Sequence, residues 1–256
     1  MARPRALRPG RGAQSVQSNF YVGMSGQVAI EKRLQTVASN VANMNTAGYR
    51  ADGVSFDTVL STTGDTPVSF STEGRTFISR RVGEMTKTDN PLDVAPTGDT
   101  WFAIKTPSGV AYTHDGRLKM GPGGELTTLN NDPVLDAGGS AMLLDPSAGA
   151  PTIAQDGMMT QNGRQVGAIG LFSIDPGAHL TRAGTSGVVP DRAATPVLDF
   201  TEAGMVQGFV EGSNVNPILE LSKLIEIQHS LDSITSANEA GDASMQDAIK
   251  TLGATS

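Results

Sequence analysis

Residues 30–50 read IEKRLQTVASNVANMNTAGYR, a stretch in which a helical pattern runs into a turn. From about Gln17 to Met44 the apolar residues recur at spacings of four and three, which is typical of a helix that packs against another helix. This seam consists of Ile30, Leu34, Val37, Val41 and Met44. Such a helix is about 40 Å long and apolar on one side. The pattern therefore predicts a partner helix.

The last segment of the chain repeats the pattern. Its seam consists of Leu224, Ile227, Leu231 and Ile234. Asn214 or Asn216 can cap the start of this helix, and Pro217 suits its first turn. We expect the two terminal segments, 16–50 and 213–256, to pair as a coiled-coil-like domain that still leaves edges for neighbours. The alternative is an ordinary helical hairpin packed on the middle of the chain.

The middle of the chain changes to a β pattern. Residues 51–89 are rich in Ser, Thr and Gly and indicate an extended connector. Residues 90–212 contain short β-type runs, such as Thr100–Thr106 and Val110–His114, separated by Gly-rich turns. Many short strands without intervening helices predict an all-β domain. The expected fold class is α+β, with paired N- and C-terminal α-helices and a central all-β domain.

The start of the chain, residues 1–15, is a basic segment of another kind. It contains four arginines and shows no apolar period. We expect it to be disordered, because it offers little apolar surface to bury. It is either a real basic tail or upstream sequence included by a wrongly chosen start. N-terminal sequencing of the native protein distinguishes the two.

Composition narrows the class of function. The 256 residues carry 19 Lys and Arg against 26 Asp and Glu, a net charge of −7, whereas nucleic-acid binding needs a concentrated basic face. The chain has no cysteine, which excludes disulfides and Cys-bound zinc. No run reaches the roughly 18 apolar residues of a membrane-spanning helix, and none has the form of a cleavable signal peptide. We therefore expect neither nucleic-acid binding nor direct membrane insertion.

Residues that carry chemistry in other proteins form no site in this pattern. The three histidines, His114, His179 and His229, lack metal-ligand spacing. Residues 184–187 lack the spacing of a nucleophile elbow, and no phosphate-binding loop is present. One acidic-amide cluster is typical of a hairpin turn and lacks EF-hand spacing. Its members are Asn130, Asn131, Asp132 and Asp136. We expect no catalytic residue, no cofactor and no metal.

Three stretches resemble the flagellar basal-body rod protein family and its hook relatives. Residues 34–50 are similar to the N-terminal signature, in which a helix closes on an Asn-rich turn. Residues 90–127 are similar to the β-domain motif, with His114 in place of the usual Arg of a Tyr-Thr-Arg-Asp-Gly pattern. Residues 208–216 are similar to the Glu-x-Ser-Asn-Val motif before the C-terminal helix. All three occur in the order that the family has.

The resemblance implies a structural subunit of the hollow rod, most like the proximal rod subunit, that polymerises through its terminal helices and catalyses nothing. Its implied partners are copies of itself, homologous rod subunits and the flagellar export apparatus. The implied location is the basal body, across the periplasm, after export without a cleavable signal. The alternatives are the distal rod subunit and a β-domain binding module.

The seam residues of both helices are the expected assembly interface. A second set is expected to form the turn and the hinge between helix and β domain, as a plain helix cap, as a contact between subunits, or as both. These residues are Asn40, Asn43, Asn45, Thr46, Gly48, Tyr49, Glu211, Ser213 and Asn214.

Overall fold

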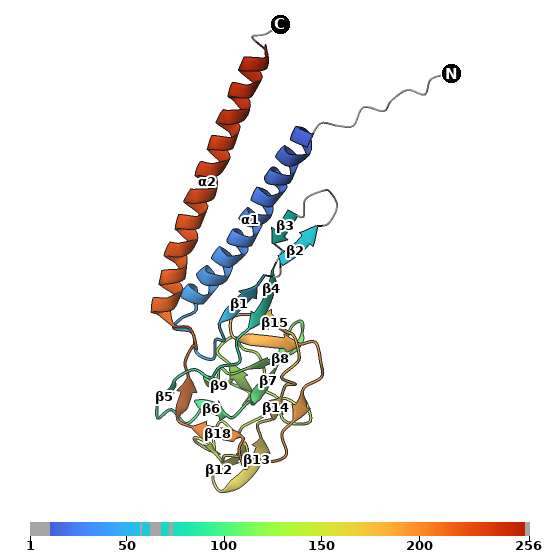
Figure 1. The fold of residues 1–256 in the computed structure, drawn as a ribbon. Helices are drawn as coiled ribbons and strands as arrows, with labels where there is room; N and C mark the ends of the chain where they lie inside the picture. Colours follow the sequence, from blue (N-terminus) through green and yellow to red (C-terminus); the bar gives the residue numbers. More distant parts are fainter. Residues whose placement is uncertain (1–10, 57, 62–67, 72–73, 254–256) are drawn as a thin grey trace, which may run out of the picture. The chain divides into compact units, whose positions relative to one another are not determined.

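The structure, a computed structural model, describes residues 11–56, 58–61, 68–71 and 74–253 (Figure 1). Residues 1–10 of the predicted basic extension lie outside this range. The described chain forms two compact units. The first, which we call the helical unit, contains the described residues that fall within 1–38, 54–76 and 218–256. The second, the β unit, contains residues 39–53 and 77–217.

Two long helices stand near the ends of the chain. Helix α1 spans Arg11–Ala42 and helix α2 spans Pro217–Gly253. Proline fits the first position of α2, because its missing N–H would have no partner inside the helix there. Helix α1 ends where Asn43 begins a turn, and the Asn43 N–H bonds back to the Ser39 carbonyl at 3.1 Å.

The predicted fold, in which the two terminal helices pair as a coiled-coil-like domain, is wrong. A closed seam would bury its apolar residues on both helices. Of the nine predicted seam residues only Val37 and Ile227 are buried, and the other seven are half-buried. The helices come near each other at Gly26, where an added Cβ atom would lie 3.9 Å from Ile234 Cδ1. Along α2, a separate run of large apolar residues is exposed. It consists of Ile218, Leu219, Leu221 and Ile225.

Between the two helices, the described chain forms many short strands that join in pairs or small sheets. Along the chain, two pairs of strands follow α1. They are β1 (Asp52–Ser55) with β4 (Arg75–Ile78), and β2 (Thr58–Ser61) with β3 (Val68–Ser71). Three further pairs belong to the β unit. They are β5 (Met85–Lys87) with β19 (Phe209–Glu211), β6 (Val94–Thr97) with β18 (Gly204–Gln207), and β9 (Leu118–Met120) with β10 (Leu126–Thr128).

A six-stranded antiparallel sheet forms the centre of the β unit, in the order β15-β16-β8-β7-β14-β17. Its strands are β7 (Trp101–Thr106), β8 (Gly109–Thr113), β14 (Leu171–Ser173), β15 (Leu180–Ala183), β16 (Gly187–Pro190) and β17 (Thr195–Pro196). A three-stranded sheet adds β11 (Thr152–Ile153), β12 (Met158–Gln161) and β13 (Arg164–Ala168). Gly-rich turns with positive φ separate many of these strands, which explains why the strands are short.

The sheets enclose a well-buried apolar core. The largest cluster includes Phe102, Leu126, Met159 and Leu171, all at most 2% exposed. A second cluster surrounds Trp101, the only tryptophan of the chain, which is fully buried. The β unit therefore has a core of its own and can fold as a domain.

The two helices are amphipathic rather than uniformly apolar. Within the residues that the structure describes, neither helix combines the length and the apolarity that a membrane crossing requires.

Candidate functional site

The Asn-rich turn after α1 is tightly fixed in the β unit. The Asn43 side-chain amide donates to the Ser39 carbonyl at 2.9 Å, and the Thr46 N–H donates to the Asn43 carbonyl at 3.1 Å. Asn45 is exposed. Gly48 has a φ of 64°, and a Cβ atom there would lie 2.1 Å from the Asp115 backbone nitrogen. Only glycine therefore allows this turn to lie against the end of β8.

The turn is joined to β1 through Asn40 and Tyr49. The Asn40 side chain exchanges two hydrogen bonds with the backbone of Asp52, at 2.8 and 2.9 Å. The Tyr49 hydroxyl donates to the Asp52 carboxylate at 3.2 Å. Arg182 forms an ion pair with the same carboxylate and lies over the Tyr49 ring, 4.4 Å from its centroid. Burial raises the pKa of Tyr49, so the phenol stays protonated and can donate.

Three ionisable side chains meet in the interior beside this turn. Arg50, His114 and Glu211 are each at most 1% exposed. Arg50 Nη2 lies 2.9 Å from Glu211 Oε1, and His114 Nδ1 lies 2.8 Å from Glu211 Oε2. Arg50 Nη2 also lies 3.1 Å from His114 Nε2. The Gly83 N–H donates to Glu211 Oε1 at 2.7 Å. We call these three side chains the buried triad.

The triad is electrostatically coupled. Burial lowers the pKa of His114, and the Arg50 charge lowers it further, against the opposing effect of the Glu211 hydrogen bond. Burial would raise the pKa of Glu211, but the hydrogen bond from His114 and the charge of Arg50 outweigh burial and lower it. Burial also lowers the pKa of Arg50 from its high ordinary value. At neutral pH the triad is therefore an Arg–Glu ion pair with a neutral imidazole.

The segment before α2 is hydrogen-bonded to the segment after α1. The Gly48 N–H donates to the Glu211 carbonyl at 2.8 Å, and the Asn214 N–H donates to the Tyr49 carbonyl at 3.2 Å. The Asn214 side chain accepts from the Ala51 N–H at 2.7 Å and donates to the Arg81 carbonyl at 2.6 Å. Ser213 accepts from the Val215 N–H at 3.2 Å, as expected of a residue near a helix start. We call residues 39–53, 79–83, 113–115 and 211–214 the junction.

The structure brings together most of the predicted turn and hinge residues, from both ends of the chain, in this junction. Arg50 and Asp52 stand in a stretch that resembles the family but were not predicted as hinge residues, and Arg182 was not noted at all. These three residues complete the junction. Arg50 stands in the quoted motif, but its partners are 64 and 161 positions away, and no local pattern shows such a pairing. His114 was noticed only as a departure from a pattern. It lies in the centre of the triad, 4.1 Å from the Trp101 ring centroid to centroid.

The predicted assembly residues divide between the two units. Val41 and Met44 belong to the β unit, whereas the other seven belong to the helical unit. None of them is fully exposed. Their role in assembly is untested by this geometry and stays a prediction.

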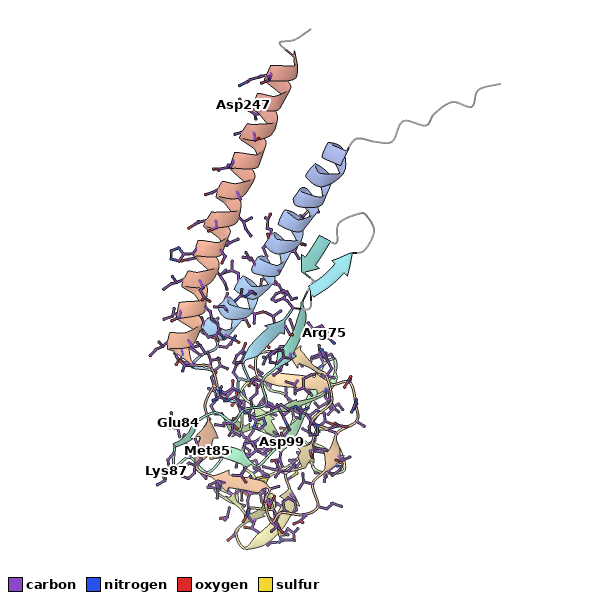
Figure 2. The ribbon with its side chains drawn as sticks, in the orientation of Figure 1. Arg75, Glu84, Met85, Lys87, Asp99 and Asp247 are labelled. Atoms are coloured by element: carbon purple, nitrogen blue, oxygen red, sulfur yellow. The ribbon has the colours of Figure 1, made fainter. Side chains whose placement is uncertain are left out.

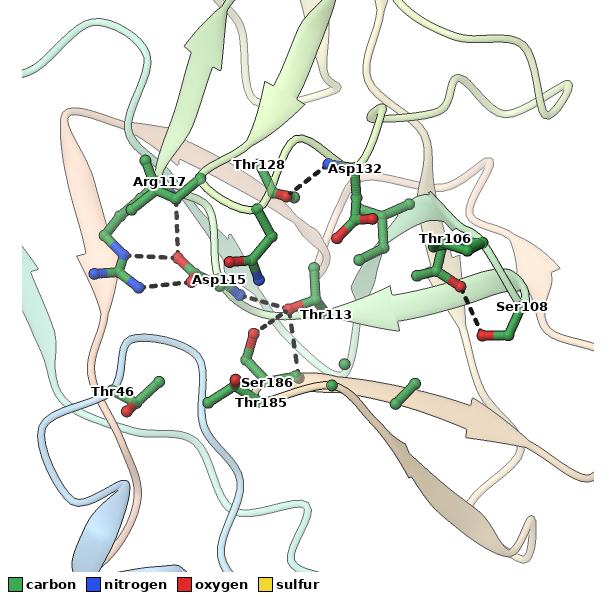
Figure 3. A pocket seen from close by; sticks show the side chains of 17 residues that line it. Thr46, Thr106, Ser108, Thr113, Asp115, Arg117, Thr128, Asp132, Thr185 and Ser186 are labelled. Carbon is green, nitrogen blue, oxygen red and sulfur yellow. Dashed lines mark hydrogen bonds and ion pairs between the residues drawn. The ribbon is translucent and has the colours of Figure 1, made fainter.

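A polar cavity of about 370 Å³ opens at one end of the six-stranded sheet (Figure 3). The turn residues weighed in the sequence, around Asn130 and Gly184, both line it. Its hydroxyls bond one another, as Thr113 Oγ1 does with Ser186 Oγ at 3.2 Å, and Asp115 is paired with Arg117. The lining contains no histidine and no lysine. No group of three or more metal-ligating side chains occurs in the part of the chain that the structure describes.

Comparisons with known proteins match both ends of the chain. Residues 20–50 match the family model described as flagella basal body rod protein. Residues 206–251 match the model described as flagellar basal body rod FlgEFG protein C-terminal. These two segments contain the turn after α1 and the segment before α2, which are the parts that the junction joins.

Relatives match over nearly the whole length. The flagellar basal-body rod protein FlgF of Mesorhizobium japonicum is 47% identical over 94% of this chain and 100% of that protein. FlgF of Rhizobium meliloti is 43% identical over 93% of this chain and 99% of that protein. The rod protein FlgG of Bacillus subtilis is 27% identical over 90% of this chain and 97% of its own length. The chain therefore belongs to the flagellar basal-body rod protein family and is most similar in it to the FlgF proteins.

Proposed function

We propose that this chain is a structural subunit of the bacterial flagellar basal-body rod, at the position of the FlgF proteins in the proximal rod. The observation that carries the proposal is the 47% identity to a FlgF protein, from one end of that protein to the other. The identity to the FlgG protein is 27% over a similar share of the chain, so the distal rod is the weaker assignment. The family is a structural one and not a family of enzymes.

Assembly with related rod subunits follows from this family, and the helical unit is the part that we assign to it. Its helices keep apolar side chains at the surface, including Met24 and Val28 on α1 and Ile218, Leu221 and Ile225 on α2. Residues 218, 221 and 225 recur at helical spacing, so they share one face of α2. Covering such a face would stabilise a contact by about 25 cal/mol per Å² of apolar surface.

Two different apolar faces also suit an open polymer. If the α2 face of one subunit packs on a different face of the next, the contact is heterologous and can repeat without closing on itself. The half-buried seam residues, such as Leu34 and Leu231, would then complete their burial between subunits. The junction supports this role because it holds the segments next to both helices on one rigid β unit.

The last part of the proposal concerns how the chain reaches the rod. We assign the chain to the basal body, where the family works, and propose that it reaches this place through the flagellar export apparatus. Absence of cysteine is compatible with such a passage, since no disulfide has to be reduced or formed.

Purified basal bodies test the proposal directly. Mass spectrometry of the rod fraction from the source cell should detect this chain at a few copies, well below the distal rod subunit. Absence of the chain from intact rods would contradict the proposal. An abundance equal to that of the distal subunit would contradict the proximal position but not the rod function.

A second experiment assigns the role of the helical unit. Deletion of residues 218–256 should abolish incorporation into basal bodies while the β unit still folds around Trp101. The matched control replaces Glu84, an exposed residue of the β unit, with alanine and should leave incorporation unchanged. Normal incorporation of the truncated chain would show that the helices are not the assembly element.

A further inference from the structure

The buried triad has a hydrogen-bond pattern that depends on one proton. A neutral imidazole has one nitrogen that donates and one that accepts. With the proton on Nδ1, His114 donates to Glu211 at 2.8 Å, while Arg50 Nη2 lies close to both ring nitrogens, 2.9 Å from Nδ1 and 3.1 Å from Nε2. A doubly protonated imidazole has two donors and no acceptor. Arg50 would then face a donor of the same charge in a site without water contact.

The surroundings of His114 offer little compensation for a second positive charge. Arg50 faces it from the turn after α1, Glu211 faces it from β19, and the Trp101 ring covers it from β7. Asp99 acts from the loop before β7 but is half exposed. Asp115, the next residue along the chain, is paired with Arg117. Glu211 is therefore the buried carboxylate that would have to balance both Arg50 and a charged His114.

The triad already holds polar groups that are not fully satisfied. Among the described residues, Arg50 Nε and Trp101 Nε1 are buried donors for which no acceptor is found. Burying a donor without an acceptor is costly, so these two unsatisfied donors reduce the net stabilisation that the closed network provides. Glu211 links this network to two backbone amides. Its carboxylate accepts from the Gly83 N–H, and its carbonyl accepts from the Gly48 N–H.

We propose that His114 makes the junction acid-sensitive: when its imidazole takes up a second proton, the contact with Arg50 is lost, and the segment that follows α1 separates from the segment that precedes α2. The proton comes from solvent and binds the free nitrogen lone pair of the imidazole. Protonation of His114 in mild acid would therefore open the junction, which contains the segment after α1 and the segment before α2. The lowered pKa of His114 agrees with this coupling, because the closed junction keeps the ring neutral.

Hydrogen exchange at the junction tests the proposal on the full-length chain. If only the open junction binds the second proton, the open fraction rises roughly tenfold at about pH 5.5, one unit below the ordinary histidine value of 6.5. The amides to follow are those of Gly48, Gly83 and Asn214, with rates corrected for the intrinsic effect of pH. The amides of Leu126 and Ile169, which bond elsewhere in the β unit, report global unfolding and should exchange far more slowly than the junction amides at every pH.

Two variants separate His114 from the other titrating groups. His114→Gln keeps a donor and an acceptor but cannot take a second proton, so the acid-induced loss of protection should disappear. His229→Gln changes an exposed histidine on α2 and should leave the loss as it is in the unchanged protein. The same loss in His114→Gln, or no loss in the unchanged protein, would overturn the proposal.

A titration of the unchanged protein covers the case in which His114→Gln fails to fold. Nuclear magnetic resonance of the histidine ring carbons should show His114 neutral for as long as the Gly48 and Gly83 amides stay protected. A ring that takes up its proton while both amides keep their protection would refute the proposal. None of these readouts depends on rod assembly, so the result is independent of the function proposed above.

Discussion

The β unit and the helical unit of this chain bury their apolar side chains to very different extents. In the β unit, Trp101 and Phe102 are at most 1% exposed, and the ionisable triad beside them is equally buried. In the helical unit, Ile227 is 1% exposed, but Ile225 on the same helix is 55% exposed and Ile218 is 79% exposed. The first region has a closed apolar core of its own, although single apolar side chains such as Leu198 and Leu143 are exposed at its surface. The second has apolar surface left for another chain to cover.

This difference suggests that residues in the two units are constrained by different kinds of contact. Residues of the β unit and its junction are fixed by contacts that the isolated chain already makes. For the exposed residues of the helices, we propose that the constraint comes from contacts within an assembly. Pairs of substitutions, one at a buried residue and one at an exposed residue, can therefore test whether the two units differ in this way.

The largest effect is expected for Glu211→Ala. Removing this carboxylate leaves Arg50 buried without its ion pair and Gly83 without its acceptor, and breaking a buried pair from one side costs about 3–5 kcal/mol. Chemical unfolding followed by the fluorescence of Trp101 measures the loss. The control is Glu84→Ala, which removes an exposed carboxylate next to β5 (Figure 2) and should change stability by less than about 0.5 kcal/mol. Equal losses in both variants would contradict the role of the triad.

Gly48→Ala should have the next largest effect. The φ of 64° is unfavourable for alanine, and the added Cβ would collide with the backbone of Asp115, so we expect a loss of about 3 kcal/mol or more. Gly184→Ala is the matched control, because Gly184 has the same φ of 64° and no atom within 4 Å of the added Cβ. It should lose only about 1–2 kcal/mol. Equal losses would mean that backbone strain alone, and not the contact with β8, fixes Gly48.

The pH dependence of stability should show two acid steps. His114 has a lowered pKa in the folded state, so the unfolded chain binds more protons, and stability falls as pH drops below about 6.5. Glu211 also has a lowered pKa, so its contribution is present above 4.5 and is lost as pH falls further. Unfolding curves at a series of pH values should show the upper step in the unchanged protein and not in His114→Gln. An upper step that persists in this variant would assign it to another group.

The sequence predicted some parts of this molecule well because their cause is local. Apolar residues at spacings of three and four predict helices, and α1 and α2 contain the predicted seams up to Val41. Pro217 is the first residue of α2, where its ring fits. The turn at Gly48 has the positive φ that glycine allows. Each of these features depends on a few neighbouring residues.

The sequence could not predict what depends on distant residues. The pairing of the helices was wrong, because a heptad pattern shows that a helix has an apolar face but not which surface covers that face. The triad was missed because His114 is 64 positions from Arg50 and 97 positions from Glu211. Either Asn214 or Asn216 was expected to cap α2, and Asn214 was also expected in the hinge. The Asn214 side chain bonds to the backbone of Ala51 and Arg81, two contacts with distant residues that no local pattern shows.

The smallest effect on stability, and the sharpest test of the comparison, is expected for Ile225→Ala. Ile225 and Ile227 are the same residue type on one helix, two positions apart, so they face different directions. Ile227→Ala removes a buried side chain and should cost about 2–5 kcal/mol, whereas Ile225→Ala should change the stability of the free chain by less than about 0.5 kcal/mol. We expect Ile225→Ala to affect incorporation into the rod more than it affects stability, since an exposed face contributes only where a neighbouring subunit covers it. Ile225→Ala chains should therefore be folded but incorporate poorly into basal bodies, as measured by mass spectrometry of the rod fraction. A folded Ile225→Ala chain that incorporates normally would show that this face of α2 stays uncovered in the assembly, and that some other surface of the helical unit makes the contact.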